Sequence, residues 1–219
     1  MKESKIITIS EELKNLPFHV IGYTMDVDNN KTEKVKNYFD EVIKDLMNRY
    51  QISDVVNIPK LKASRDGYKK LGIDPSRYRL ACESLVRRIV KGFDVYRIND
   101  IVDLGNILSI KTHRSVCVVD LDKIVGNILI EKGHKEDIYE GINRGLINIT
   151  NMPAYKDEIS YFGTPTSDTM RTAVSDTTKS ILVMIICFND EDLEQDEELL
   201  INLYKEYANA SNIEKLRVE

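Results

Sequence analysis

The sequence of 219 residues predicts an α+β fold, and three observations indicate it. Apolar residues recur at helical spacing between residues 35 and 50, which is typical of an amphipathic helix. Short apolar runs separated by Gly and Asn follow residue 115 and indicate several strands. The longest apolar run, residues 181–188, has the length of a strand and falls short of the roughly 18 residues that a membrane span needs. This order of elements fits an α+β or a mixed α/β fold and lacks the regular alternation of a doubly wound sheet.

The N-terminal half is expected to contain two strands followed by helices. Residues 6–9 indicate an edge strand and residues 18–25 a second strand. Asp74 followed by Pro75 favours a helix start, because Asp caps the first turn and Pro fits the first helical position. Helices are therefore expected at residues 30–50, 64–71, 74–92 and 99–110, the last capped at Asn99 or Asp100.

The C-terminal half is expected to be mainly strands, closed by one helix. Residues 181–188 predict a central strand that is buried on both faces, because the run contains no polar alternation. The acidic residues that follow it suit the first turn of a helix at residues 190–210. The remaining strand candidates are residues 115–119, 128–131, 146–149 and 158–162, with a turn at 120–124.

The charge of the chain is uneven. Its net charge is −5, which argues against a protein that does nothing but bind nucleic acid. Residues 60–97, however, carry eleven Lys and Arg against four Asp and Glu, so this segment is +7 and the remainder is −12. Such asymmetry is typical of a surface that meets an anionic ligand, and ordinary solvated helix faces produce it as well.

Cysteine and histidine spacing indicates neither a metal site nor a disulfide framework. The three cysteines are widely separated and form no C-x-x-C pair, which favours buried thiols in a reducing, cytoplasmic location. The three histidines lie far apart in the sequence. Phosphate-binding, dinucleotide-binding and hydrolase motifs are missing from the sequence, so we expect no metal and no cofactor. The N-terminus does not read as a signal peptide.

Two polar stretches are candidates for a binding site. In the first, Asp103, Asn106 and Ser109 recur every three residues on the expected helix, which keeps them near one face. This stripe could line a pocket or could be an exposed helix face. The second stretch, residues 162–178, is rich in hydroxyl groups and precedes the buried strand. It could form the hydrogen-bonding rim of a pocket for a polar ligand or be an ordinary polar loop.

The two stretches, in this order, resemble the tRNA-binding and editing module formed by the third and fourth domains of the bacterial phenylalanyl-tRNA synthetase beta subunit. Residues 102–106 and 116–126 resemble its V-D-x-x-N and F-D-x-D-K-[LI]-x-G signature, and residues 87–99 its lead-in. Residues 163–188 resemble its glycine loop, threonine-rich turn and long apolar strand. The resemblance is strongest over residues 64–188, and it implies a single domain over 1–219 with a helical C-terminal extension at 190–212.

The resemblance implies a three-layer β/β/α module of the stand-alone branch of that family. In the synthetase this module hydrolyses tyrosine wrongly attached to the tRNA for phenylalanine. Asn106 matches the family's pocket asparagine. Gly105 stands at the family's threonine position, Cys117 at its histidine and Ser115 at its proline, while Met184 lies on or near its glutamate. Most of the polar groups that would position water and read the amino acid are therefore replaced.

The polar stretches, the basic segment and the resemblance together give two sets of candidate residues. The candidate pocket residues are Asp103, Asn106, Ser109, Cys117, Thr166, Ser167, Asp168 and Arg171, with no catalytic residue assigned among them. The candidate RNA-contacting residues are Arg65, Arg79, Arg87 and Arg88, all in the basic segment.

The resemblance implies a tRNA-binding protein that could act in trans as a hydrolase of mischarged aminoacyl-tRNA. If the chain is an enzyme, it is an aminoacyl-tRNA deacylase and not an intact ligase. The alternative is a protein that binds an amino acid or another small molecule in the retained pocket and has lost tRNA editing. Its partners would accordingly be tRNA, aminoacyl-tRNA or a free amino acid, and no membrane.

Overall fold

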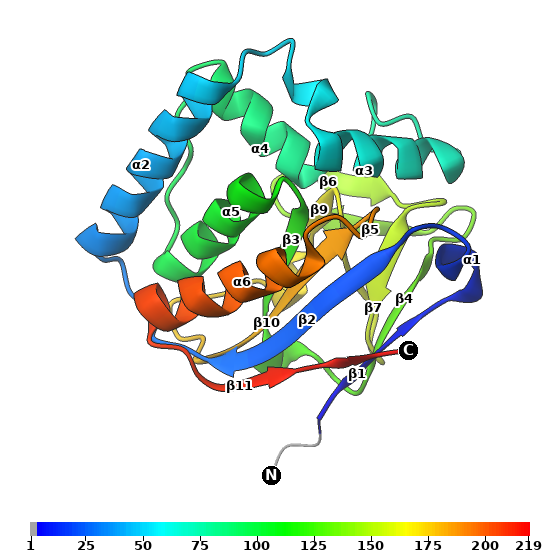
Figure 1. The fold of residues 1–219 in the computed structure, drawn as a ribbon. Coiled ribbons are helices and arrows are strands. Elements are labelled where there is room, and N and C mark those ends of the chain that lie inside the picture. Colours follow the sequence, from blue (N-terminus) through cyan, green and yellow to red (C-terminus); the bar gives the residue numbers. More distant parts are fainter. Residues whose placement is uncertain (1–3) are drawn as a thin grey trace.

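A computed structural model describes residues 4–219, and it shows two stacked sheets with helices on one side (Figure 1). One sheet has six strands in the order β12-β1-β4-β7-β8-β9, and the other has four in the order β11-β2-β10-β3. A separate hairpin joins β5 to β6. The strands are β1 Ile6–Ile9, β2 His19–Asp26, β3 Ser115–Asp120, β4 Ile128–Lys132, β5 Ile138–Gly141, β6 Gly145–Asn148, β7 Pro153–Lys156, β8 Tyr161–Thr164, β9 Ser167–Asp168, β10 Ser180–Cys187, β11 Ser211–Lys215 and β12 Arg217–Val218.

The helices lie mainly against the outer face of the four-stranded sheet (Figure 1). They are α1 Glu11–Lys14, α2 Glu33–Arg49, α3 Pro59–Lys70, α4 Ala81–Val90, α5 Asp100–Thr112 and α6 Leu193–Ala208, with short 3-10 turns η1 Val55–Asn57, η2 Leu121–Lys123 and η3 Met170–Thr172. None of the helices found in residues 4–219 combines the length and the apolarity that crossing a bilayer requires.

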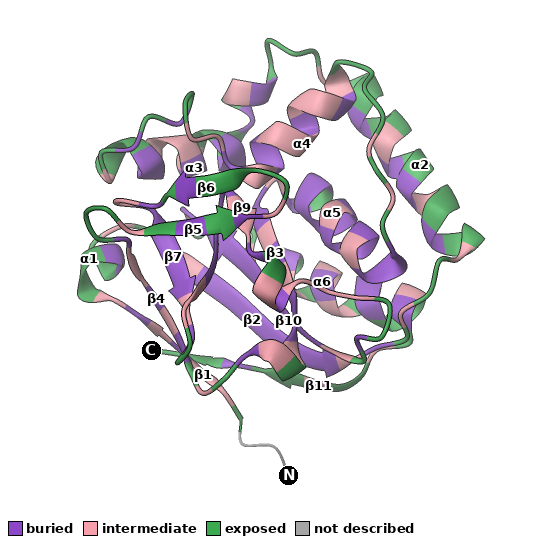
Figure 2. Cartoon of the chain, turned by 180° about the vertical axis from the view of Figure 1, so that it is seen from behind, coloured by how far each residue is buried: buried purple, intermediate pink, exposed green. Residues whose placement is uncertain are grey.

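Strand β10 explains why the molecule has three layers. Alternate side chains of a strand point to opposite faces of its sheet. Ile181, Val183 and Ile185 pack with α2, α5 and α6 in the helical core, whereas Leu182 and Met184 pack with the six-stranded sheet. Both faces of the four-stranded sheet are therefore covered at its centre, where β2 and β10 are buried almost throughout, whereas the edge strand β11 is mostly exposed (Figure 2). The predicted three-layer α+β architecture and its buried central strand are confirmed.

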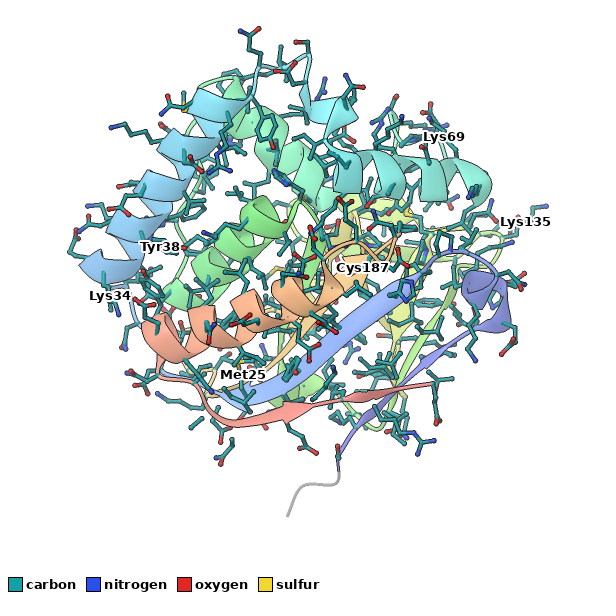
Figure 3. All side chains as sticks on the ribbon, in the orientation of Figure 1. Met25, Lys34, Tyr38, Lys69, Lys135 and Cys187 are labelled. Atoms are coloured by element: carbon teal, nitrogen blue, oxygen red, sulfur yellow. The ribbon has the colours of Figure 1, made fainter. Side chains whose placement is uncertain are left out.

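Several charged side chains lie at the periphery of the molecule, whereas the cysteines lie in its interior. In Figure 3, Lys34, Lys69 and Lys135 extend outward from the edges of the molecule, while Cys187 lies among the packed elements. Cys187 is fully buried at the end of β10. All three cysteines are buried free thiols.

The structure corrects several expected boundaries. Asp74 does not cap a helix; its carboxyl accepts a hydrogen bond from the Ser76 amide at 2.8 Å and forms a turn, so α4 starts only at Ala81. The terminal helix ends at Ala208, because Asn209 adopts a left-handed conformation and the chain continues as β11. The expected extension over 190–212 is thus helical only between Leu193 and Ala208.

Two expected strands also differ. Strand β1 is not at an edge, since the C-terminal strand β12 pairs with it in parallel. Residues 157–160 form a turn between β7 and β8 instead of a strand, because the Asp157 carboxyl accepts hydrogen bonds from the amides of Ile159 and Ser160. Local sequence patterns do not reveal the pairing of β1 with β12, because that pairing depends on a strand far along the chain.

Candidate functional site

The turn that joins β8 to β9 is held by four surrounding elements. The Pro165 carbonyl accepts hydrogen bonds from the Ala81 amide at 2.8 Å and from the Ser115 hydroxyl at 3.0 Å. The Tyr68 hydroxyl of α3 lies 3.0 Å from Thr166 Oγ1, and the Tyr139 hydroxyl of β5 lies 3.0 Å from the hydroxyl of Thr164. The hydroxyl-rich turn is therefore a fixed part of the fold.

Asp168 follows this turn, and its carboxyl group points into the space between the two sheets. In the β8–β9 pairing it lies opposite Gly163. A Cβ atom at Gly163 would lie 2.4 Å from Asp168 Oδ1 and 3.0 Å from the Tyr155 ring, so only glycine leaves room for this carboxyl. The residue as a whole keeps part of its surface because β9 is an edge strand, but the carboxyl group itself is enclosed.

The surroundings of Asp168 disfavour its ionised form. Burial raises the pKa of its carboxyl to about 7, and a hydrogen bond with the Cys117 thiol offsets only part of that effect. Among residues 4–219, no Lys, Arg or His forms a salt bridge with it (the candidate partner Arg171 pairs elsewhere). A carboxyl with such a pKa changes its protonation state near neutral pH. Strongly shifted groups of this kind are common in functional sites.

Cys117 faces Asp168 from β3, where it pairs with Met184 on β10. Burial raises the pKa of the Cys117 thiol well above its usual range, and the nearby Asp168 charge raises it further. The thiol therefore stays protonated at neutral pH and acts as a weak hydrogen-bond donor. It is unsuited to be a nucleophile, since the thiolate is the reactive form of cysteine.

An open cavity of about 290 Å³ lies beside this group and shares Tyr139 with it. The Tyr139 hydroxyl also donates a hydrogen bond to the Ser167 carbonyl. Two polar atoms of residues that line the cavity, Thr169 Oγ1 and Arg171 Nε, are buried and have no hydrogen-bond partner among residues 4–219. The lining residues are Ile138, Tyr139, Glu140, Ser160, Tyr161, Thr169, Met170 and Arg171.

The structure brings Cys117, Thr166, Ser167 and Asp168 together from two separate parts of the sequence. Arg171 turns away from them. Its guanidinium binds Asp157 through two hydrogen bonds, at 2.8 and 3.1 Å. Burial opposes ionisation of Asp157, but backbone amides and Arg171 outweigh it and lower the pKa of that carboxyl. Arg171 thus fastens η3 to the β7–β8 turn.

The polar stripe of α5 has partners in the helical layer. Asp103 forms a 2.6 Å salt bridge with Arg97, and Ser109 donates a 2.7 Å hydrogen bond to the Arg114 carbonyl. Asn106 is partly buried, and its side chain has no hydrogen bond among residues 4–219. Gly105 lies against Val118 of β3, where a Cβ atom would come within 2.6 Å of that side chain. Close packing of helix on sheet therefore explains a glycine within this helix.

Three of the four arginines expected to contact RNA share one carboxylate partner, and the fourth has different neighbours. Arg65, Arg79 and Arg87 all approach the carboxylate of Glu83. Arg88 instead donates a hydrogen bond to the Asp94 carbonyl at 2.5 Å and lies over the ring of Tyr96.

Three tyrosines of this region carry no local signal in the sequence. Tyr68, Tyr139 and Tyr155 come from α3, β5 and β7, and burial raises the pKa of each hydroxyl. All three stay protonated at neutral pH, which makes them hydrogen-bond donors. Their shared environment depends on how the strands pair and on how α3 packs against the sheet, so only a prediction of the strand order and of this helix packing could have brought them together.

Comparison with known proteins identifies the fold and the family of the chain. The fold is similar to an N-terminal fragment of the phenylalanyl-tRNA synthetase beta subunit from Pyrococcus horikoshii, with a TM-score of 0.54 and 11% sequence identity. The alignment covers all of this chain and 54% of that fragment, so the chain spans about half of its length. A search of curated proteins finds no match. The profile of the B3/4 domain matches residues 63–205, which is well over half of the sequence. The chain therefore belongs to the B3/4 domain family.

Proposed function

We propose that this chain hydrolyses the ester bond of an aminoacyl-tRNA, with the Asp168 carboxylate as the base that activates water. The observation that carries the proposal is the Asp168 carboxyl group, which is enclosed, has no cationic partner among residues 4–219 and has a pKa raised to about 7. A general base is most effective when its pKa lies near the working pH. Membership of the B3/4 domain family and a fold similar to that of a phenylalanyl-tRNA synthetase subunit support aminoacyl-tRNA as the proposed substrate class.

The step balances with water as the only co-reactant. The Asp168 carboxylate accepts a proton from water while the water oxygen attacks the ester carbonyl carbon. The bond between that carbon and the ribose oxygen then breaks, the ribose oxygen takes the proton, and free amino acid leaves. Because burial keeps the Cys117 thiol protonated, it supports Asp168 as a hydrogen-bond donor and forms no covalent intermediate.

The same carboxylate favours a second candidate function. An enclosed carboxylate without a cationic partner would gain a charge-assisted hydrogen bond from the ammonium group of a free amino acid. The net charge of −5 is also more typical of a small-molecule binder than of an RNA-binding protein. In this case the chain would bind an amino acid without hydrolysing an ester.

The decisive experiment compares Asp168→Asn with Asp176→Asn, which changes an exposed aspartate in the same polar segment. Release of amino acids from a pool of misacylated tRNAs is measured across pH. We expect the wild-type rate to rise with pH as Asp168 ionises near pH 7, and Asp168→Asn to lower it by roughly 10²- to 10⁴-fold. Asp176→Asn should leave it unchanged.

The outcomes separate the two functions. Equal release by Asp168→Asn and Asp176→Asn would rule out Asp168 as the base. If the wild-type protein releases nothing, yet a free amino acid stabilises it against heat and Asp168→Asn removes that stabilisation, the second function is correct.

A further inference from the structure

Three arginines gather around one buried carboxylate on the α3–α4 side of the molecule. Glu83 in the first turn of α4 is 1% exposed, and Arg65 of α3 binds both of its oxygens at 2.8 and 2.9 Å. Arg79, in the segment just before α4, and Arg87 on α4 flank it at 3.4 and 3.9 Å. We call Arg65, Arg79, Arg87 and Glu83 the arginine cluster.

Many of the N–H donors in the arginine cluster have no hydrogen-bond acceptor among residues 4–219. Arg65 donates hydrogen bonds to both oxygens of Glu83, whereas the side chains of Arg79 and Arg87 only form ion pairs with that carboxylate and have no hydrogen bond among residues 4–219. The Nε atom of Arg79 is buried and lies 3.4 Å from Glu83 Oε1, but it has no hydrogen-bond partner among residues 4–219. A guanidinium carries five N–H donors and no acceptor. An acceptor-rich anion is therefore the ligand that these side chains can satisfy.

The charge of the cluster points the same way. Three guanidinium groups surround one carboxylate, which leaves two positive charges without a counter-charge inside the cluster. Arg79 and Arg87 keep 39% and 25% of their side-chain surface, so a ligand can reach them. Guanidinium groups match the geometry of phosphate oxygens and bind them through paired hydrogen bonds.

The cluster also adjoins the Asp168 region. The amide of Ala81, two residues before Glu83, donates a hydrogen bond to Pro165 in the turn next to Asp168. Tyr68, one turn after Arg65 on α3, contacts Thr166 in the same turn. The helices α3 and α4, which carry Arg65 and Arg87, therefore hold the loop that precedes the candidate base.

We propose that the arginine cluster binds a backbone phosphate of the RNA whose aminoacyl end enters the site at Asp168. This inference rests on the proposed function for the identity of the RNA. The chemistry of the cluster itself requires only a phosphate group. Glu83 holds the three guanidinium groups together, while Arg79 and Arg87 supply the open donors.

The test uses Arg79→Ala and Arg87→Ala, with Lys44→Ala on α2 as the control that removes an exposed positive charge elsewhere. Binding of total tRNA is measured over a series of salt concentrations. Each arginine variant should weaken binding by about tenfold and reduce the slope of log affinity against log salt by about 1. Lys44→Ala should change neither.

A second variant should change the affinity for tRNA in the opposite direction. Glu83→Gln keeps the shape and one acceptor oxygen but removes the negative charge. It should therefore tighten tRNA binding even if it lowers the melting temperature, which a purely structural role of the cluster does not predict. Unchanged tRNA affinity in both arginine variants would overturn the inference. It is equally overturned if inorganic phosphate stabilises the protein through Arg79 and Arg87 while tRNA and single-stranded RNA do not bind.

Hydrolysis of a small substrate separates this inference from the proposed function. The wild-type protein and the two arginine variants should cleave an aminoacyl ester that carries no phosphate, such as tyrosine ethyl ester, at equal rates. With aminoacyl-tRNA the arginine variants should show a raised KM and an unchanged kcat. A wild-type protein that binds tRNA through the cluster but cleaves neither substrate refutes the proposed function and leaves the phosphate site standing.

Discussion

Two buried carboxyl groups, Asp196 in the helical layer and Asp168 beside the sheets, differ in what surrounds them. Asp196 receives hydrogen bonds from Lys60 Nζ at 3.0 Å and from Arg114 Nε at 2.6 Å, and the Arg114 side chain is fully buried. Asp168 has a thiol and tyrosine rings around it and no such cation among residues 4–219. Burying a charge is costly unless it is paired. The negative charge of Asp196 is therefore compensated within the fold. The ionised form of Asp168 is not compensated, and either a bound ligand or a proton can stabilise that carboxyl group.

Removing a cation that compensates Asp196 should produce the largest change in the free energy of unfolding. Arg114→Met keeps the length of the side chain but leaves Asp196 with Lys60 alone, and it also removes the hydrogen bonds to Asn189 and to the Glu191 carbonyl. We expect a loss of roughly 3 to 5 kcal/mol in the free energy of unfolding, measured by chemical denaturation. Arg49→Met on the exposed side of α2 is the control and should change stability by less than about 0.5 kcal/mol.

Neutralising Asp168 should stabilise the protein, which is the opposite of the effect expected for Arg114→Met. Its folded-state pKa lies above the ordinary value of 3.8, so between pH 4 and pH 7 the folded protein holds a proton that the unfolded chain has lost. Stability contributed by this group therefore falls as pH rises through that window. Asp168→Asn should raise the free energy of unfolding at pH 8 by on the order of 2 kcal/mol, with little difference at pH 4. Thermal unfolding at both pH values tests this, and destabilisation at pH 8 would show that the carboxylate is satisfied in a way that the structure does not reveal.

The smallest effect is expected where only one neutral hydrogen bond is lost. Tyr68→Phe removes the 3.0 Å contact with Thr166 but keeps the ring that packs against Phe188. The free energy of unfolding should fall by about 1 kcal/mol. The double variant with Thr166→Val should be no less stable than Tyr68→Phe alone, and additive losses would mean that the two hydroxyls do not depend on each other.

Local patterns in the sequence determined much of the helical layer. The apolar face of α2, the cap at Asn99 and the unbroken apolar run of β10 each reflect physics within a few neighbouring residues. The sequence also revealed the family through residues 102–106 and 163–188, and with it the three layers. These features could be predicted because periodicity and capping depend on residues that are close along the chain.

Only the tertiary structure decided which polar residues share a site. Asp103 and Arg171 match the pattern of candidate pocket residues as well as Asp168 does, but they form salt bridges with Arg97 and Asp157. Whether a carboxylate is compensated depends on side chains brought near by strand pairing and helix packing, which spacing along the chain does not encode. The sequence alone named Cys117 and Asp168 as candidates, but it did not show that they are in contact. That contact depends on the pairing of Asp168 with Gly163 in the β8–β9 hairpin, which turns the Asp168 carboxyl toward Cys117.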